Sequence, residues 1–369
     1  MKTLYVINSP SYVENHPIHT CGQLLENDPL SEHFTYLYYN LVKFGLIDRV
    51  VVFPRRGQHD NFKKDFAEKI EIDNDKCIII NWDRERMIDI INSDPLSYVY
   101  CWSDYEVCQK IKNSFVMVNP VVAINNRSRL NTNYLHYALI EGMSHEKKFR
   151  LIPDNMPIGV CPLTSKKFSK IDLEVIRNTK KEYDWIMVSS FDPRKRHLDF
   201  LRLAGSNPRF SSLKGCIIAR NPDNKGRIND SHHVYNQIIN SRFMDNIDIH
   251  MNTTNEKKID LLSKSKIYAC ISSLDFGPRA TIEALQLALP VLSSPHMGAC
   301  DWIFPNENGE IIKEDLSDMN KIFYQMLDKY EDGHYVEGSR RISSLLTPEK
   351  IYPSLVEDIS QQFHKKFGK

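Results

Sequence analysis

Two carboxylates flank a short turn in the second half of the chain. Asp275 comes directly after a buried apolar run, and Glu283 follows in a segment with helical spacing. Pro278 lies between them, and proline favours the first residue of a helix. A helix that begins at Pro278 would place Glu283 roughly 7.5 Å along its axis, at about 1.5 Å per residue. A surface acid, a turn and an ordinary packed helix would explain the same residues.

The start of this predicted helix is a candidate anion site. The first N–H groups of a helix have no partner within the helix, so the amides around Arg279 and Ala280 can bind a phosphate. Gly277 would let a ligand approach the backbone closely. With phosphates at this position, Glu283 suits the ribose hydroxyls of a nucleotide. Asp275 could then accept hydrogen bonds from a sugar beyond the phosphates.

A basic turn is the second candidate cluster. Residues 185–189 have the apolar pattern of a strand, Ser190 follows, and Arg194, Lys195 and Arg196 precede an apolar helical pattern over 198–204. Three adjacent cations are suited to binding a diphosphate. The alternative is a solvated basic turn with no ligand.

Together these segments resemble the retaining glycosyltransferases of GT-B fold, family-four type (glycosyl transferases group 1). That family carries the acidic motif E-G-F-G-x-x-x-x-E-A. This chain has Asp275-Phe276-Gly277 and then Glu283-Ala284, with Leu289-Pro290-Val291 where the family has G-x-P-V. Two departures are an Asp as the first acid and the absence of the Gly before Phe276.

The resemblance extends to the basic turn. The family has V-G-R-L followed by K-G here, and its Arg and Lys hold the diphosphate of the donor. Lys195 matches the Lys, whereas Ser190 stands at the Arg position, so Arg194 or Arg196 is expected to supply the missing charge. Asn221 follows the strand pattern whose end contacts the nucleotide base in the family.

The amino half fits the family less closely. Gly22 lies in the loop after the first strand pattern, where the family has Gly-Gly. Asn125-Asn126-Arg127 stands where the family often has a histidine. Ile152-Pro153-Asp154-Asn155 resembles the I-P-N-G exit from the first domain, and a final helix over 348–363 suits a segment that crosses back onto it.

Short apolar runs alternate with helical patterns along the chain, which favours parallel α/β units. A helix is expected from Ser31, with Gly45 as its left-handed C-terminal cap. The non-periodic stretch 152–170 is the expected hinge. The expected strands cover residues 3–7, 49–53, 76–80, 97–100, 114–124, 149–152, 185–189, 215–219, 247–251, 267–271 and 290–292.

The resemblance therefore implies a GT-B architecture, with two Rossmann-like doubly wound domains that face a central cleft. Residues 1–165 would form the acceptor-binding domain, and the helix over 348–369 would cross back onto it. Residues 166–347 would form the domain that binds the nucleotide sugar. In such folds, ligands bind at the carboxyl ends of the strands.

Other motifs compete with this interpretation. Asp73-Asn74-Asp75 satisfies the metal-binding D-x-D of another glycosyltransferase fold, but it precedes a strand pattern and suits a solvated turn. His16, His19 and Cys21 lack a fourth ligand at finger-like spacing, so no metal is expected, although they could contact the acceptor or the sugar. The chain has neither G-x-G-x-x-G after its first strand nor a Walker sequence. His232, His233 and His250 are expected at the surface or in packing.

Composition limits the class of protein. The chain has 369 residues with 48 Lys+Arg against 47 Asp+Glu, so it lacks the basic excess of proteins that coat nucleic acid. No apolar run approaches the ~18 residues of a membrane span. The 8 cysteines are scattered, which favours free thiols in a reducing cytoplasm. Lys365-Lys366 is thin support for peripheral membrane contact, since an anionic-lipid patch usually has about 4–8 clustered cations.

The expected function is transfer of a sugar, with retention, from a UDP-sugar or other nucleotide sugar to a glycan, lipid-linked or other hydroxyl acceptor, with no metal or cofactor. Lys195 and Asp275 are the expected catalytic residues. In the family a leaving phosphate oxygen could take the acceptor's proton. Two alternatives stay open: a noncatalytic nucleotide- or sugar-binding protein, and a nucleic-acid-base glycosyltransferase of viral type. The near-neutral charge of residues 1–165 disfavours the latter.

Overall fold

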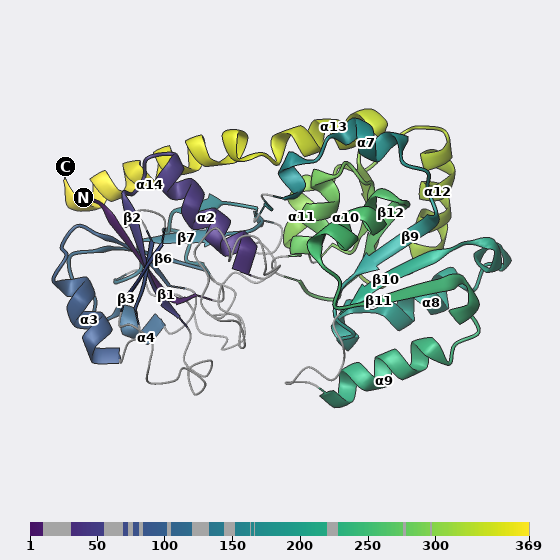
Figure 1. Ribbon diagram of the computed structural model, residues 1–369, viewed down its shortest axis with the longest axis horizontal. Helices are drawn as coiled ribbons and strands as arrows, with labels where there is room; N and C mark the ends of the chain where they lie inside the picture. Colours follow the sequence, from purple (N-terminus) through teal and green to yellow (C-terminus); the bar gives the residue numbers. More distant parts are fainter. Residues whose placement is uncertain are drawn as a thin grey trace. The chain divides into compact units, whose positions relative to one another are not determined.

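The computed structural model divides the chain into two compact units (Figure 1). Unit 1 comprises Met1–Glu141, Phe149–Lys166 and Pro348–Lys369, and unit 2 comprises Gly142–Lys148 and Lys167–Thr347. The structure describes residues 1–9, 31–54, 69–72, 77–80, 84–101, 105–119, 133–143, 152–162, 164–165, 167–219, 228–275, 278–295 and 297–368.

Unit 1 is built on a sheet of eight described strands in the order β3-β4-β2-β1-β5-β6-β7-β8. Neighbouring strands are parallel except for β3 and β4. The strands are β1 (Thr3–Ser9), β2 (Arg49–Pro54), β3 (Lys69–Ile72), β4 (Cys77–Ile80), β5 (Tyr98–Cys101), β6 (Phe115–Val118), β7 (Tyr137–Ile140) and β8 (Ile158–Val160).

The helices described in unit 1 are α2 (Ser31–Lys43), α3 (Arg84–Asn92), α4 (Tyr105–Cys108) and α14 (Pro348–Phe367). Gly45 has a φ of +80° after α2, so the predicted left-handed cap is confirmed. The final helix α14 packs on unit 1. Its Phe363 stacks on Tyr98 of β5 at 4.7 Å between ring centroids, and its Asp358 accepts a hydrogen bond from the Tyr137 hydroxyl.

Unit 2 contains a parallel sheet of six described strands in the order β11-β10-β9-β12-β13-β14. The strands are β9 (Tyr183–Val188), β10 (Gly215–Ala219), β11 (Ile247–Met251), β12 (Ser265–Cys270), β13 (Val291–Ser293) and β14 (Gly309–Ile311). The α-helices are α7 (Leu173–Asn178), α8 (His197–Ala204), α9 (Ile228–Ile239), α10 (Asn255–Ser263), α11 (Arg279–Gln286), α12 (Met319–Glu331) and α13 (Val336–Leu345).

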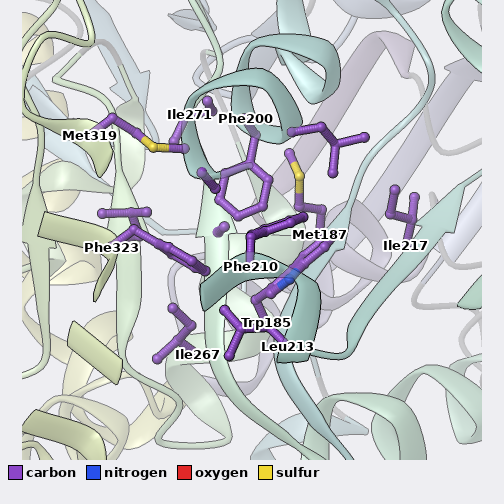
Figure 2. Packing of buried hydrophobic residues seen from close by; sticks show 14 of the residues in the cluster. Trp185, Met187, Phe200, Phe210, Leu213, Ile217, Ile267, Ile271, Met319 and Phe323 are labelled. Carbon is purple, nitrogen blue, oxygen red and sulfur yellow. The ribbon is translucent and has the colours of Figure 1, made fainter. Parts of the chain in front are cut away.

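The core of unit 2 lies between one face of this sheet and helices α8, α9 and α12. Trp185 of β9 is fully buried, and its ring lies 4.8 Å from that of Phe200 on α8. Phe323 of α12 meets Phe200 edge-on at 5.2 Å, and Figure 2 shows these rings packed beside Met187 and Phe210. Helices α10 and α11 contact β12, and Figure 1 shows them on the other side of the sheet from α8 and α9. With helices on both faces, the sheet is doubly wound.

Several strand predictions need correction. The strand expected over 114–124 ends at Val118 within the described residues, because β6 occupies only Phe115–Val118. The stretch 152–170, expected as a non-periodic hinge, contains the strand β8 and the short 3-10 helix η1 (Phe168–Lys170). The strand expected over 149–152 falls largely outside the described residues, and Ile152 itself lies in a bend. β3, β7 and β14 were not expected.

Candidate functional site

The candidate site lies at the carboxyl edge of the sheet in unit 2, where β9 and β12 run side by side. β9 ends at Val188 and leads into the 3-10 helix η2 (Pro193–Lys195), and β12 ends at Cys270 ahead of Asp275. The two strands pair in parallel, so their carboxyl ends meet at one edge. This edge is where doubly wound sheets bind ligands.

Lys195 and Asp275 form an ion pair across these two loops. The Lys195 ammonium donates to Oδ2 of Asp275, and each side chain is 17% exposed. A backbone hydrogen bond also holds the two loops together, because the Ser273 N–H donates to the Arg194 carbonyl oxygen at 2.8 Å. The structure thus brings together the two residues that the sequence marked as catalytic.

Asp192 shapes the basic turn. Its carboxylate accepts a hydrogen bond from the Arg194 N–H at 3.0 Å and so caps η2. The same carboxylate accepts from Nε and Nη2 of the Arg194 guanidinium, with an Nη2–Oδ2 distance of 2.9 Å. These hydrogen bonds raise the pKa of Arg194 above its ordinary value. The charge of Arg194 is therefore already compensated within the turn.

Arg196 ends the basic turn in a left-handed backbone conformation. Its φ is +56° and its ψ is +32°, and the next residue begins α8. Glycine adopts this region most readily, and the resemblance placed a glycine here. Nη1 of Arg196 lies 3.5 Å from the carbonyl oxygen of Glu314, a neutral partner. Ser190, at the expected arginine position, is exposed.

His197 lies directly behind the turn and is 1% exposed. Its Nε2 is 3.1 Å from the hydroxyl of Ser189 at the end of β9. Burial, together with the nearby Lys195 charge, lowers the pKa of His197 to about 3. The imidazole is therefore neutral near pH 7 and acts as a support for the loop. No motif in the sequence marks His197.

Helix α11 begins beside Asp275. The Pro278 carbonyl oxygen accepts hydrogen bonds from the N–H groups of Thr281 at 2.8 Å and of Ile282 at 3.2 Å. Pro278 is thus the N-terminal cap and Arg279 the first helical residue, which corrects the expected start by one position. The backbone amides of Arg279 and Ala280 belong to the first turn, as expected for the candidate anion site.

Glu283 lies on the inner side of α11 and is 2% exposed. Nζ of Lys258 on α10 donates to Oε1 of Glu283 at 2.7 Å, and Nζ also lies 5.1 Å from the centre of the Phe168 ring. No sequence pattern points to this partner, because Lys257-Lys258 has the appearance of a solvated helix face. Only the fold shows that Lys258 is 8% exposed and opposite a buried acid.

The remaining candidate residues are either outside the described part of the chain or away from this edge. Gly22, Gly277, Asn221, Asp73–Asp75, Asn125–Arg127, His16, His19 and Cys21 lie outside the described residues. His233 lies 2.9 Å from Gln237 on the exposed surface of α9, and burial lowers the pKa of His250. Among the described residues, no group of three or more His, Cys, Asp or Glu side chains could hold a metal ion.

None of the described helices is long and apolar enough to cross a membrane. The cysteines at 101, 108, 161, 216, 270 and 300 are buried thiols.

Comparison with known proteins finds a family match within the second unit. Residues 169–334 match the family described as Glycosyl transferases group 1. A comparison with curated protein sequences found no match.

Solved structures show the fold. The chain is similar to sucrose-phosphate synthase from Thermosynechococcus elongatus, with a TM-score of 0.68, 12% identity and full coverage of both chains. It is similar to a glycosyltransferase from Rickettsia africae, with a TM-score of 0.64, 13% identity and coverage of 100% of this chain and 99% of that one. It is also similar to HepE from Anabaena in complex with UDP, with a TM-score of 0.62, 11% identity and full coverage of both chains. These are GT-B proteins, and the predicted two-domain GT-B architecture is confirmed.

Proposed function

We propose that this chain transfers a sugar from a UDP-sugar, with retention of configuration, to a hydroxyl acceptor, because it has a GT-B fold and its residues 169–334 match the family Glycosyl transferases group 1. The observation that carries the proposal is the Lys195–Asp275 pair beside the start of α11. At this edge of the sheet, Lys195 would offer a cation to a diphosphate and Asp275 a carboxylate to a sugar. The structure of HepE in complex with UDP supports the choice of nucleotide.

Lys195 would stabilise the departing diphosphate. Negative charge grows on the leaving phosphate oxygen as its bond to the sugar breaks, and a preorganised cation stabilises such charge strongly. The first-turn amides of α11 would bind the same group, since a helix N-terminus favours anions. Arg196 is the better candidate for a second cation, because the charge of Arg194 is compensated by Asp192. This site would need no metal.

Asp275 would bind hydroxyl groups of the donor sugar. We expect a bound diphosphate to compete with Asp275 for the Lys195 ammonium. The carboxylate of Asp275 would then be available to accept hydrogen bonds from the sugar. The acceptor hydroxyl would attack the anomeric carbon, and its proton would pass to the leaving phosphate oxygen, so that no protein base is required.

Glu283 would bind the ribose hydroxyls. The Lys258 ammonium beside it favours the ionised carboxylate, which is the stronger hydrogen-bond acceptor. Since Glu283 is 2% exposed, ribose binding would require a small displacement of the side chains that cover it.

The acceptor would bind through unit 1, as the family resemblance implies, and would be a glycan, a lipid-linked sugar or another hydroxyl compound. We propose that the enzyme works in the cytoplasm, with peripheral membrane contact if the acceptor is lipid-linked.

A screen of nucleotide sugars tests this function. The expected result is that one UDP-sugar raises the melting temperature of the protein and is slowly hydrolysed to UDP. Binding of UDP without release of UDP from any UDP-sugar would instead identify a noncatalytic binder. Activity confined to nucleic-acid acceptors, with a strong dependence on salt, would identify a base glycosyltransferase.

A further inference from the structure

A second candidate site lies at the opposite edge of the sheet in unit 2. A cavity of about 160 Å³ opens beside Ser265 and Lys266, where β12 begins, and beside Leu289 and Pro290, which precede β13. Helices α7 and α13 supply other walls of this cavity, and Figure 1 shows them next to each other. The Lys195–Asp275 pair follows the carboxyl ends of the strands, so the cavity is separated from it by the length of the sheet.

The charge of the cavity wall is entirely positive among the described residues. Arg177, Lys181, Lys266 and Arg340 line the cavity, and no Asp or Glu does. Three of these cations are paired with acids that do not line the cavity. Glu174 pairs with both Arg177 and Arg340, and Lys266 pairs with Asp184 and Glu331.

Lys181 differs from the other three cations because its partners are neutral. Its ammonium donates to the carbonyl oxygens of Ile176 at 3.1 Å and Ser263 at 2.6 Å. An ammonium has three N–H donors, so with respect to the described residues one is left for a ligand in the cavity. Burial lowers the pKa of Lys181 to about 8.

Ser339 contributes an independent observation. It lines the same cavity from α13, is 2% exposed, and its hydroxyl has no hydrogen-bond partner among the described residues. A buried hydroxyl without a partner carries a free-energy cost, and native structures usually satisfy such groups with a ligand or water. The hydroxyl can donate to an anion.

Much of the remaining wall is apolar. Leu173, Ile176, Leu287 and Val336 contribute hydrocarbon surface. A cavity of similar volume in a well-studied lysozyme variant, about 150 Å³, binds benzene. The space therefore suits one small ring or branched chain with a polar head.

We propose that this cavity binds a small organic monocarboxylate with an aromatic or branched apolar body, its carboxylate held by Lys181 and Ser339. The apolar body would lie against the leucine, isoleucine and valine side chains of the wall. The proposal is independent of the sugar-transfer reaction, because it uses no residue of the nucleotide site.

Benzoate and benzamide provide the test, because they share a shape and differ in charge. Isothermal titration calorimetry with the full chain should show benzoate binding with a dissociation constant of about 1 mM, as expected of so small a ligand. Benzamide should bind at least tenfold more weakly. Saturating UDP should leave benzoate affinity unchanged. Equal affinity for the two compounds, no benzoate binding up to its solubility limit, or displacement by UDP would each overturn the proposal.

Variants locate the binding. Lys181→Met should reduce benzoate affinity at least tenfold and bring it to the level of benzamide, whereas Lys180→Met, which removes an adjacent exposed charge, should leave it unchanged. If Lys181→Met fails to fold, Ser339→Ala serves instead and should weaken benzoate about tenfold or more, as expected for the loss of one hydrogen bond to a charged group. Parental affinity in both folded variants, or in Ser339→Ala alone when Lys181→Met does not fold, would contradict the assignment.

Discussion

Nζ of Lys258 lies 2.7 Å from Oε1 of Glu283, and the two residues are 8% and 2% exposed. The pair joins α10 to α11 behind the candidate diphosphate site. A buried ion pair contributes little to stability as a whole, but loss of one partner leaves an uncompensated charge. Glu283 thus has a structural role in addition to the ribose contact proposed for it.

These two roles can be separated by a double variant. Glu283→Ala alone should weaken UDP binding by about 1.5–3 kcal/mol and lower the free energy of unfolding by about 3–5 kcal/mol, because the Lys258 ammonium stays buried. Glu283→Leu combined with Lys258→Met should recover most of the stability but not the UDP affinity. Calorimetry with UDP and urea unfolding measure the two quantities. Parental UDP affinity in the stable double variant would show that Glu283 does not contact the ribose.

Lys195→Ala should reduce turnover by roughly 10²–10³-fold, the effect of losing one preorganised electrostatic contact in the transition state. The affinity for the UDP-sugar should fall much less, because the charge on the diphosphate grows only as the bond breaks. Steady-state kinetics and titration with the UDP-sugar give both values. Arg196→Ala should show a similar defect, whereas Arg194→Ala should be mild because Asp192 already compensates that charge. Near-parental turnover in all three variants would refute the leaving-group role.

Chelation should leave activity nearly intact. The proposed diphosphate site uses Lys195, its arginine neighbour and the first-turn amides of α11, and all of these persist in EDTA. Turnover is measured before and after dialysis against EDTA. Complete loss that manganese restores would instead point to the D-x-D at Asp73–Asp75.

Acid should destabilise unit 2 through His197. Its pKa is about 3 when folded, against about 6.5 when unfolded, so below pH 6.5 the unfolded state binds a proton that the folded state does not. The contribution of His197 to the free energy of unfolding is therefore fully present above pH 6.5 and decreases as the pH falls. Between pH 7.5 and pH 5 the loss from this group is about 2 kcal/mol. Urea unfolding at the two pH values measures the loss. In His197→Gln, the loss of stability between the two pH values should be smaller by the contribution of this group. An unchanged pH dependence in that variant would contradict a buried neutral imidazole at His197.

Arg196→Gly should raise the free energy of unfolding by roughly 0.5–1 kcal/mol, because glycine adopts the φ of +56° without steric cost. Arg196→Ala is the matched control. It removes the guanidinium but keeps a Cβ atom on the left-handed backbone, so the free energy of unfolding should stay near the parental value. Both variants should lose turnover equally if the guanidinium contacts the diphosphate. Chemical unfolding and kinetics on the pair test this, and equal stability of the two would show that the backbone is not strained.

Much of the fold follows from local pattern. The strands around β1, β2, β9, β10, β11 and β12 are apolar runs bounded by turns or helical periods, which is the pattern of buried parallel strands. β8 and β14 occupy only Ile158–Val160 and Gly309–Ile311. Segments this short have no period, and their pairing with a neighbouring strand is what makes them strands.

The candidate site was predictable only in part. Lys195 and Asp275 were found because they match the basic turn and the acidic motif of the family that the sequence resembles. Asp192, His197 and Lys258 were missed because their roles depend on what faces them. In sequence, Lys258 is the second of two adjacent lysines, and only the fold distinguishes the buried ammonium from its exposed neighbour Lys257.

The placement of α14 in unit 1 has a consequence for synthesis on the ribosome. Unit 1 takes its last helix from Pro348–Lys369, which follows nearly all of unit 2 in the chain. At about 5–20 residues per second, on the order of ten seconds or more separate the emergence of the sheet from that of its covering helix. During this interval Tyr98, which stacks on Phe363, lacks its aromatic partner. Unit 2 can therefore finish folding first, while the nascent sheet of unit 1 exposes apolar surface that favours chaperone binding.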